Sequence, residues 1–430
     1  MTRVVRRVLS IVAACALVLG TWTLAWAHAT LVRAEPAAGS RLATSPSRVW
    51  LLFSEALEPT LAHLTLVAPD GGVRHLVAAG DPHDVHALIA PVDALAPGAY
   101  RLLWHVVSAD GHPVEGSYVF TVGAPSVSRP PPAPPAAEFA PTTWGPAVLG
   151  APLVPALLRG LGVGALMGLV GLLTLARSGR GLRLASGLAV AAFLLLALHL
   201  GAWLMNVSPQ RELTGDWVTT ALASGVGRVE LWRTGLALLA LWALGLARRP
   251  RLALAFAWGA LLVSGAVGHS MAMHAAWAVP AKVLHLAAGA CWLGGLLWLI
   301  VCAPLGRDGA AFVREAERVS AIALVAVVLV ALSGAAQALL FLPTPIALVR
   351  SAYGAVTLAK VVGLLALAGF GAYHRFRVLP RLERDRRTGF GGALRAEVLV
   401  MAVVILLGGL LAYIPPPAAP GAHAASTSAD

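Results

Sequence analysis

Hydrophobic and polar positions alternate in the first part of the chain and give way to long apolar runs in the second. Between residues 28 and 122, short alternating segments have the pattern of half-buried β-strands. Turn sequences such as Pro69–Gly72 and Ala96–Gly98 separate them. About seven short strands at this spacing predict an all-β immunoglobulin-like sandwich or Greek-key barrel. The clearest expected strands are Arg48–Phe53, Ala62–Ala68, Val73–Val77, Ala87–Ala90, Ala99–Val107 and Gly116–Val122.

The apolar runs of the second part predict an all-α membrane domain. Most are long enough to cross a bilayer as a helix, and the third and fourth are near the lower limit. The chain is therefore expected to contain about eight transmembrane helices. They are placed at Val148–Ala176, Leu184–Met205, Leu231–Ala247, Leu252–Gly268, Ala281–Ala303, Val319–Phe341, Ala355–Tyr373 and Arg395–Ile414.

Arginine residues give the expected orientation of these helices. Positive residues gather in cytoplasmic loops of membrane proteins. Four alternate loops hold most of the arginines of the membrane part: Arg177, Arg180, Arg183, Arg248, Arg249, Arg251, Arg307, Arg314, Arg318, Arg375, Arg377, Arg381, Arg384, Arg386 and Arg387. The other loops hold only Arg211, Arg228, Lys282 and Arg350, with Arg233 at a helix start. This alternation predicts that both ends of the membrane domain lie outside the cytoplasm.

The sequence also indicates the boundaries of a signal peptide, a linker and a C-terminal tail. Residues 1–27 have a basic start, an apolar stretch and Ala25-Trp26-Ala27, which is the pattern of a signal peptide. Residues 28–123 are the expected β-domain, and 124–146 form a proline-rich linker expected to hold it off the membrane surface. Residues 147–414 are the expected membrane domain, and 415–430 an outer disordered tail.

Composition supports a membrane location and argues against nucleic-acid binding. The chain is 58% hydrophobic and 12% charged, which is too apolar for a soluble protein. Its formal net charge is +12, but the basic residues lie in short loops between apolar runs and not on one surface. The expected partner is the lipid bilayer. The expected location is the cytoplasmic membrane, as a multi-pass protein whose N-terminal domain is periplasmic or extracellular.

His28 is the first candidate functional residue, because cleavage after Ala27 would give it a free α-amino group. Amine and imidazole nitrogens of one residue can chelate a metal, and such nitrogen ligands suit Cu(II). Asp110 and His112 lie two residues apart, so on a strand they would point to the same side. One carboxylate and one further imidazole could complete the site. Taken alone, a histidine after a signal peptide is more often accidental, and an Asp-x-His sequence more often lies on a solvated turn.

The β-domain resembles the copper resistance protein C (CopC) family. The resemblance lies in a histidine after the cleavage site, Glu35–Ser40, Phe53-Ser54-Glu55, and Trp104 followed by Ser108–Pro113, Gly116 and Phe120. It implies a Cu(II) site with His28, Asp110 and His112 as ligands and Glu55 as an outer ligand or a supporting group. Cu(I) prefers sulfur ligands, and this domain has no methionine, so a separate Cu(I) site is not expected in it. The remaining histidines, His63, His75, His83, His86 and His105, are expected at the surface or satisfied by neighbours.

The membrane part resembles the copper resistance protein D (CopD) family. The resemblance lies in Gly268-His269, Leu284-His285, Cys291–Gly295, Tyr353-Gly354, Lys360 and Glu397. The chain thus resembles a fused CopC–CopD protein along nearly its whole mature length.

Ionisable residues inside membrane spans are costly and usually functional. The expected topology places a set of them toward the outer face, where histidine and methionine suit copper in either oxidation state. This candidate copper path is His199, His269, Met271, Met273, His274, His285 and Lys360. Cys302, His374 and Glu397 lie nearer the inner face as a candidate release zone. Alternatively, His285 bonds a neighbouring helix, and Met271, Met273 and the Trp292–Gly295 motif only pack.

The leading hypothesis is a non-enzymatic copper transporter that captures Cu(II) outside and passes it to the membrane domain for import, homeostasis or resistance. Copper is the expected ligand, as Cu(II) and, in the membrane domain, also as Cu(I), with copper chaperones as candidate partners. One alternative is a haem-bearing copper reductase in which His199 and His285 hold the haem. Another is a metallochaperone without transport. A copper-oxidising enzyme is disfavoured, because Asp110 would occupy the position that oxygen needs.

Overall fold

The N-terminal domain is a sandwich of two β-sheets in the computed structural model, which describes residues 31–123, 147–148, 151–175, 179–208, 213–266, 277–302, 309–382, 390–414 and 416–417. One sheet has the order β1-β3-β7-β6 and the other the order β2-β9-β8-β4-β5. Their bounds are β1 Leu31–Glu35, β2 Arg41–Leu42, β3 Arg48–Phe53, β4 His63–Val67, β5 Val73–Leu76, β6 Ala79–Asp81, β7 Asp84–Pro91, β8 Gly98–Val107 and β9 Pro113–Val122. The predicted all-β class is confirmed.

Alternating residues of the two sheets meet in the core of this sandwich. Phe53 and Trp104 pack edge to face, with ring centroids 6.3 Å apart. Gly116 lies opposite Trp104 in the β8–β9 pairing, and a Cβ at Gly116 would come within 2.2 Å of the indole ring. A larger residue at position 116 would therefore displace the tryptophan that fills the core.

All six predicted strands lie on observed strands, and three observed strands were not predicted. β2 is only two residues long and pairs in parallel with β9. β6 has only three residues, and its pairing with β7 shifts register between Gly80 and Asp81. Short and irregular strands leave no alternating pattern, so hydrophobic periodicity could not find them.

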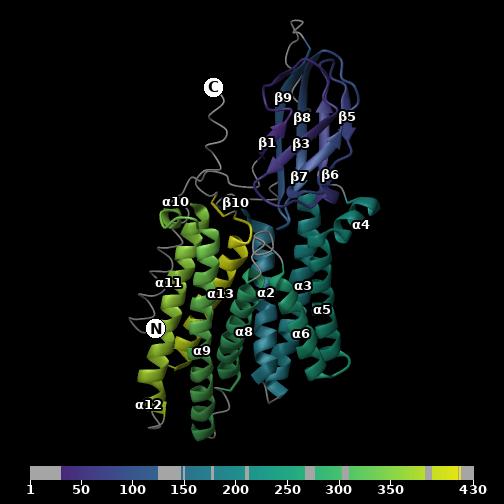
Figure 1. Ribbon diagram of the computed structural model, residues 1–430. Helices are drawn as coiled ribbons and strands as arrows, with labels where there is room; N and C mark the ends of the chain where they lie inside the picture. The colour runs from purple at the N-terminus through teal and green to yellow at the C-terminus, as the bar shows by residue number, and fades with distance from the viewer. Residues whose placement is uncertain are drawn as a thin grey trace.

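The second domain is a bundle of helices that run roughly parallel below the sandwich (Figure 1). α2 packs against α3, α6, α8 and α13, so it lies in the middle of the bundle. The long helices are α2 Leu153–Leu175, α3 Gly179–Val207, α5 Gly225–Gly245, α6 Pro250–Gly265, α8 Ala278–Cys302, α9 Gly309–Phe341, α11 Ala352–Tyr373 and α13 Phe390–Leu411. Shorter elements connect them: the strand pair β10 Ala147–Val148 and β11 Ala151–Pro152, the helices α4 Gly215–Ala223, α10 Ala347–Arg350 and α12 Leu379–Leu382, and the π-helix η3 His374–Val378.

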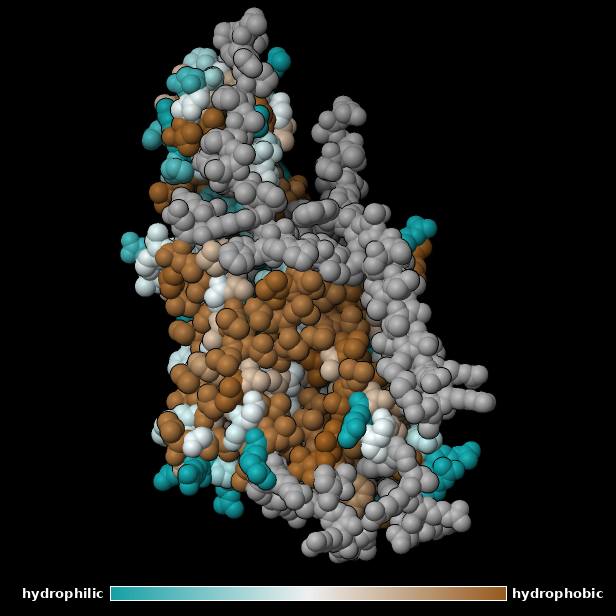
Figure 2. Space-filling view, turned by 180° about the vertical axis from the view of Figure 1, so that it is seen from behind, coloured by the Kyte–Doolittle hydropathy of each residue, from teal (hydrophilic) through white to brown (hydrophobic). Residues whose placement is uncertain are grey.

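Each of the eight predicted spans falls on a helix, but the count of eight is corrected to six. Within the described residues, six helices are long and apolar enough to cross a membrane: α2, α3, α8, α9, α11 and α13. α6 has only 16 residues, and α5 contains three charged residues, Arg228, Glu230 and Arg233. These two consecutive helices nevertheless pack on each other and within the bundle. Figure 2 shows the broad apolar surface of the bundle, with hydrophilic residues at its lower end.

The β-domain sits directly on one end of the bundle, above α3 and α5 (Figure 1). One apolar cluster contains residues of both domains: Leu61, Val107, Trp203, Leu204, Val207, Ala221 and Val226. The β-domain is therefore docked on the membrane domain, and the expectation that the linker holds it off the membrane surface stays a prediction. Buried apolar contacts across the junction stabilise the docked arrangement, whatever the linker does. Linker residues 124–146 themselves lie outside the described residues.

Candidate functional site

The loop Ser108–Pro113 between β8 and β9 brings Asp110 and His112 together at the junction of the two domains. Asp110 Oδ1 accepts hydrogen bonds from the Ser108 hydroxyl and, at 3.2 Å, from the His112 backbone N–H. It also lies 2.8 Å from His112 Nδ1. These contacts form in a turn and not on the strand that sequence spacing suggested, since Gly111 between them has a φ of +96°.

The carboxylate of Asp110 thus orients the imidazole of His112. A histidine whose Nδ1 is held by a carboxylate presents Nε2 to a metal, which is a common arrangement in metal sites. The Asp110 side chain is only 1% exposed and that of His112 13% exposed. The loop therefore holds both side chains in a largely buried position.

Glu55, another predicted ligand of this site, lies on a neighbouring chain segment. Ala109 donates a backbone hydrogen bond to the Ala56 carbonyl, 2.8 Å away, so Glu55 belongs to the segment beside the loop. Leu31, the first described residue, pairs with Phe53. His28 itself lies outside the described residues. Within the described ranges, no three His, Cys, Asp or Glu side chains are grouped as a metal site.

Hydrogen bonds from Gly225, Val226 and Trp203 help fix the β-domain on the membrane domain. Glu58 accepts hydrogen bonds from the backbone N–H groups of Gly225 and Val226, at 3.1 and 3.2 Å, at the start of α5. A carboxylate is favourable there, because the helix dipole is positive at its N-terminus. Trp203 of α3 donates to the Gly111 carbonyl at 3.1 Å, which ties the candidate loop itself to the membrane domain.

Two histidines that were expected to have no role in metal binding are part of this junction. His105 is fully buried, and its Nε2 donates to the Val207 carbonyl at 3.0 Å while Nδ1 lies 2.9 Å from Glu115. The ring of His63 packs on Trp217 of α4, with centroids 5.6 Å apart. Partial burial, followed by the charges of His105 and His75, lowers the pKa of His63. Both residues stabilise docking.

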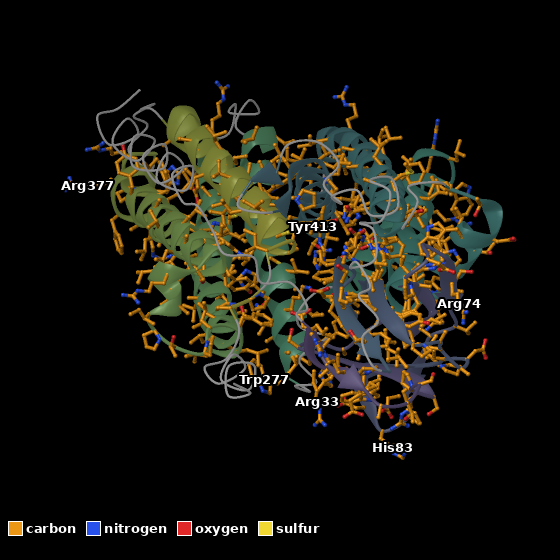
Figure 3. The ribbon with its side chains drawn as sticks, turned by 90° about the horizontal axis from the view of Figure 1, so that it is seen from above. Arg33, Arg74, His83, Trp277, Arg377 and Tyr413 are labelled. Atoms are coloured by element: carbon orange, nitrogen blue, oxygen red, sulfur yellow. The ribbon has the colours of Figure 1, made fainter. Side chains whose placement is uncertain are left out.

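Tyr413, two residues after α13, connects the loop to the interior of the bundle. Its ring lies edge to face on that of His112, with centroids 5.0 Å apart. Its hydroxyl is 2.7 Å from His199 Nε2 on α3. Seen from above, Tyr413 lies near the middle of the molecule, where the helices meet the β-domain, whereas Arg377 lies at the edge of the bundle (Figure 3). Tyr413 thus contacts both candidate histidines.

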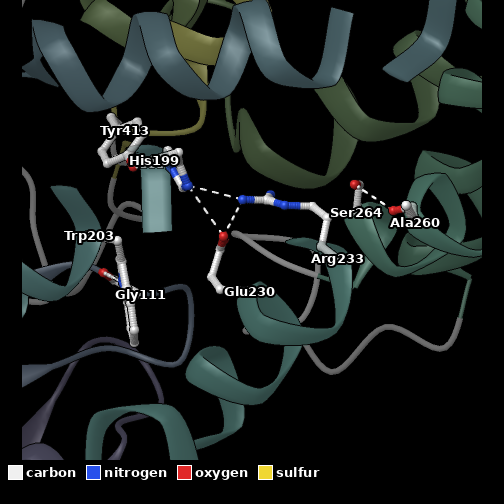
Figure 4. A network of polar contacts seen from close by, with 8 residues as sticks. All are labelled: Gly111, His199, Trp203, Glu230, Arg233, Ala260, Ser264 and Tyr413. Atoms are coloured by element: carbon white, nitrogen blue, oxygen red, sulfur yellow. Dashed lines mark hydrogen bonds and ion pairs between the residues drawn. The ribbon is translucent and has the colours of Figure 1, made fainter. Parts of the chain in front are cut away.

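A buried charged network continues below Tyr413 (Figure 4). His199 Nδ1 lies 3.2 Å from Glu230 Oε2 and 3.0 Å from Arg233 Nη2, and Arg233 donates to the same Glu230 oxygen. All three side chains are at most 1% exposed. Sequence reasoning found His199 but missed Glu230 and Tyr413. Glu230 could have been found as an acidic residue next to an apolar run. It was missed because the expected span began at the following residue, Leu231.

The remaining histidines and methionines of the predicted copper path either have partners other than those of His199 or lie outside the described residues. His285 Nδ1 lies 3.0 Å from the Ser333 hydroxyl of α9, so His199 and His285 have different partners. α8 packs on α6, but α3 contacts α8 only slightly. His269, Met271, Met273 and His274 lie outside the described residues. Metal or haem binding by His199 and His285 together stays a prediction.

The predicted inner zone contains a second buried pair. His374 Nδ1 lies 3.0 Å from Glu397 Oε2, and Trp292 donates to the other oxygen of Glu397 at 3.3 Å. The sequence thus placed His374 and Glu397 correctly at one level of the bundle. Trp292 of the Trp292–Gly295 motif has a polar partner, while Gly294 packs backbone to backbone on Gly171 of α2.

Family models match both domains. The CopC domain model matches residues 31–123, and the model of copper resistance protein D matches residues 313–411. The chain is 38% identical over 116 residues to copper resistance protein C of Escherichia coli, which covers 25% of this chain and 90% of that protein.

One relative matches across both domains. The copper transport protein CutJ of Bacillus subtilis is 26% identical over 433 residues, covering 92% of this chain and 75% of its own. Among solved structures, the crystal structure of CopC from Methylosinus trichosporium OB3b is 35% identical and covers 22% of this chain and 94% of that chain, with a TM-score of 0.22.

Proposed function

The chain belongs to the family of fused CopC–CopD proteins, and on that premise we propose that it captures Cu(II) outside the cytoplasmic membrane and passes it to its own membrane domain for import or copper homeostasis. In this proposal it is not an enzyme, and its N-terminal domain is periplasmic or extracellular. The arginine-rich loops at the far end of the bundle support this orientation.

The proposed capture site uses the loop Ser108–Pro113 and the new N-terminus. His112 binds Cu(II) through Nε2 and His28 through its amine and imidazole. Asp110 adds a carboxylate oxygen after it releases His112 Nδ1, with which it is paired in the structure, and Glu55 lies at the edge of the site. Leu31 pairs beside the Phe53–Ala56 segment, and three residues of chain span at most about 10 Å. That reach is compatible with His28 and His112 sharing one ion.

The observation that carries the proposed transfer is the contact of His112 with Tyr413. A ligand of the capture site already lies 5.0 Å, between ring centroids, from a residue of the membrane domain. Tyr413 in turn contacts His199, the outermost described histidine of the proposed path. Copper that leaves His112 would therefore enter the bundle without a movement of the whole β-domain. His269, Met271, Met273, His274, His285 and Lys360 are the proposed continuation.

Copper uptake into proteoliposomes tests this function. We expect protein that starts at His28 to take up copper, because all proposed ligands are then present. A protein with one extra residue before His28 loses the amine ligand and should lose most uptake at limiting copper, as should His112→Ala. His83→Ala is a matched control, since His83 lies on an exposed turn of the same domain.

Two outcomes would contradict the proposal. Equal uptake by the extended protein and the protein that starts at His28 would show that the capture site is not the one proposed. Tight copper binding without any uptake would favour the alternative function, a metallochaperone without transport. The same purified sample should show no Soret band, since a haem spectrum would favour the reductase alternative.

A further inference from the structure

Ser333 of α9 makes hydrogen bonds that together determine which ring nitrogen of His285 carries a hydrogen. The Ser333 side chain is buried, and its hydroxyl lies 2.5 Å from the Leu329 carbonyl and 3.3 Å from the Val330 carbonyl, one turn earlier in its own helix. A serine hydroxyl has a single hydrogen, and a carbonyl can only accept it. Toward His285 Nδ1, 3.0 Å away, the hydroxyl oxygen therefore acts as the acceptor. The hydrogen of that contact comes from Nδ1.

The position of the His285 ring agrees with this assignment. A Cβ added to Gly334 would lie 3.5 Å from His285 Cε1 and 3.8 Å from Nδ1, whereas Nε2 is not among the atoms within 4 Å of it. The Nδ1–Cε1 edge of the ring thus faces α9, where the Val330 carbonyl is a second acceptor that acts on His285. Only one nitrogen of a neutral imidazole carries a hydrogen. With that hydrogen on Nδ1, Nε2 keeps a lone pair.

His199 differs from His285 in this respect. Its Nε2 lies 2.7 Å from the Tyr413 hydroxyl, and its Nδ1 lies 3.2 Å from Glu230 and 3.0 Å from Arg233. Both ring nitrogens of His199 are therefore engaged. The hydrogen bond found for the His285 ring among the described residues is the one from Nδ1 to Ser333. Of these two histidines, His285 is the one whose Nε2 can bind a metal without first losing a hydrogen bond.

We propose that Ser333 is a positioning residue for copper transfer: it keeps the hydrogen of His285 on Nδ1 and so makes Nε2 the nitrogen that binds copper. A metal binds the imidazole nitrogen that has no hydrogen, and the hydrogen bond of the other nitrogen decides which one that is. In most histidine ligands that partner is a carboxylate, a backbone carbonyl or water. Here a hydroxyl whose own hydrogen is bound to its helix has the same effect.

This assignment joins two interpretations that the sequence left as alternatives. A hydrogen bond to a neighbouring helix and a role in the copper path are compatible for His285, because they use different nitrogens of one ring. Without the Ser333 hydroxyl, Nδ1 loses its hydrogen-bond acceptor, and the neutral ring can place its hydrogen on Nε2, which then cannot bind a metal. The tautomer of His285 follows from the contacts alone, whereas the binding of copper to Nε2 rests on the proposed function.

Solid-state NMR of the full chain in lipid, without copper and at an alkaline pH, tests the tautomer directly. Labelling with ¹³C,¹⁵N-histidine distinguishes the two nitrogens, because only Nε2 is bonded to Cδ2, and the His285 signals are those missing from His285→Gln. We expect the hydrogen on Nδ1 in the original protein. In Ser333→Ala, a substantial share of the rings should carry it on Nε2. Ser333→Thr should behave like the original protein, because a threonine hydroxyl in a helix bonds the same carbonyls.

Ser264 of α6 offers a matched control. It is 4% exposed, as is Ser333, and its hydroxyl donates to the Ala260 carbonyl at 2.8 Å, with no histidine bonded to it among the described contacts. Ser264→Ala removes the same kind of bond within a helix and should leave the tautomer of His285 unchanged. In proteoliposomes at limiting copper, Ser333→Ala should lower copper uptake about tenfold. Ser333→Thr and Ser264→Ala should retain the uptake of the original protein.

Three results would overturn the proposal: a hydrogen on Nε2 in the original protein, an unchanged tautomer in Ser333→Ala, or full copper uptake by Ser333→Ala. If Ser333→Ala does not fold, Ser333→Cys gives the same test, because a thiol is similar in size and only a weak acceptor. The tautomer is measured without copper. A failure of the proposed function, seen as no uptake by the original protein, is therefore distinguishable from a failure of the assignment to Ser333.

Discussion

The loop Ser108–Pro113 and the network below Tyr413 both pair a histidine with a carboxylate. They differ in how far apart along the chain the paired residues are. In the loop, Asp110 and His112 are two residues apart and their geometry comes from local hydrogen bonds. In the network, His199 meets Glu230 across 31 positions and Tyr413 across 214. The loop is thus an almost autonomous unit, whereas the network exists only when several helices are packed. Changes in the loop should affect metal binding, and changes in the network should affect the stability of the whole bundle.

The largest effect is expected from the buried pair of the network. Glu230→Leu leaves Arg233 with an uncompensated charge, which should cost about 3–5 kcal/mol of stability. The double variant Glu230→Leu, Arg233→Leu removes both charges and should recover most of that loss. Unfolding midpoints in detergent measure both. A single variant as stable as the double variant would show that the pair is not coupled.

The loop should instead respond in copper affinity. His112→Ala should weaken Cu(II) binding by about a hundredfold or more, because one imidazole ligand is lost while the strands around it remain. The unfolding midpoint without copper should change little. Competition with a chelator of known affinity measures binding in the full chain. If the affinity of the variant stays within threefold of the original, His112 is not a ligand.

Gly111 joins the two regions and should give an intermediate effect. A Cβ at this position would lie 3.0 Å from Val226 and 3.2 Å from Trp203, and its φ of +96° is unfavourable for any side chain. Gly39 also has a positive φ, of +72°, but open space around its Cβ position. Gly111→Ala should therefore be more destabilising than Gly39→Ala, by about 1 kcal/mol for the added contact. Equal losses in thermal unfolding would indicate that Gly111 is only a turn residue.

The smallest effect concerns pH. The pKa of His63 is lowered in the folded protein, so its neutral form is favoured there. The unfolded chain then binds more protons as the pH falls below about 6.5, and stability falls with it. Because the side chain is partly solvated, the loss should be modest. His63→Gln should flatten the pH dependence of the unfolding midpoint between pH 7 and 5. An unchanged slope would show that other groups cause this dependence.

Local patterns carried the predictions that succeeded. Strand alternation gave β3, β4 and β8. The Asp-x-His spacing pointed to two residues that do lie together, although in a turn and not on the expected strand. Glu58, Tyr413 and Glu230 were not found, because their partners are far along the chain; Glu58 and Val226 are 168 positions apart. The predicted number of spans was too high because hydropathy was judged along the chain alone. It does not show that the charged residues of α5 are buried and paired with α3.

The central claim is that copper passes between the domains where they touch, and its most direct test separates binding from docking. Glu58→Ala removes the carboxylate that accepts from the start of α5 and leaves the proposed copper ligands unchanged. Glu35→Ala is the matched control, since Glu35 is exposed and pairs only with Arg33 in the contacts described. We expect Glu58→Ala to retain Cu(II) affinity in the full chain and to lose several-fold in proteoliposome uptake at limiting copper, with Glu35→Ala unchanged in both. Unchanged uptake by Glu58→Ala, together with demonstrable undocking of its β-domain, would contradict the claim.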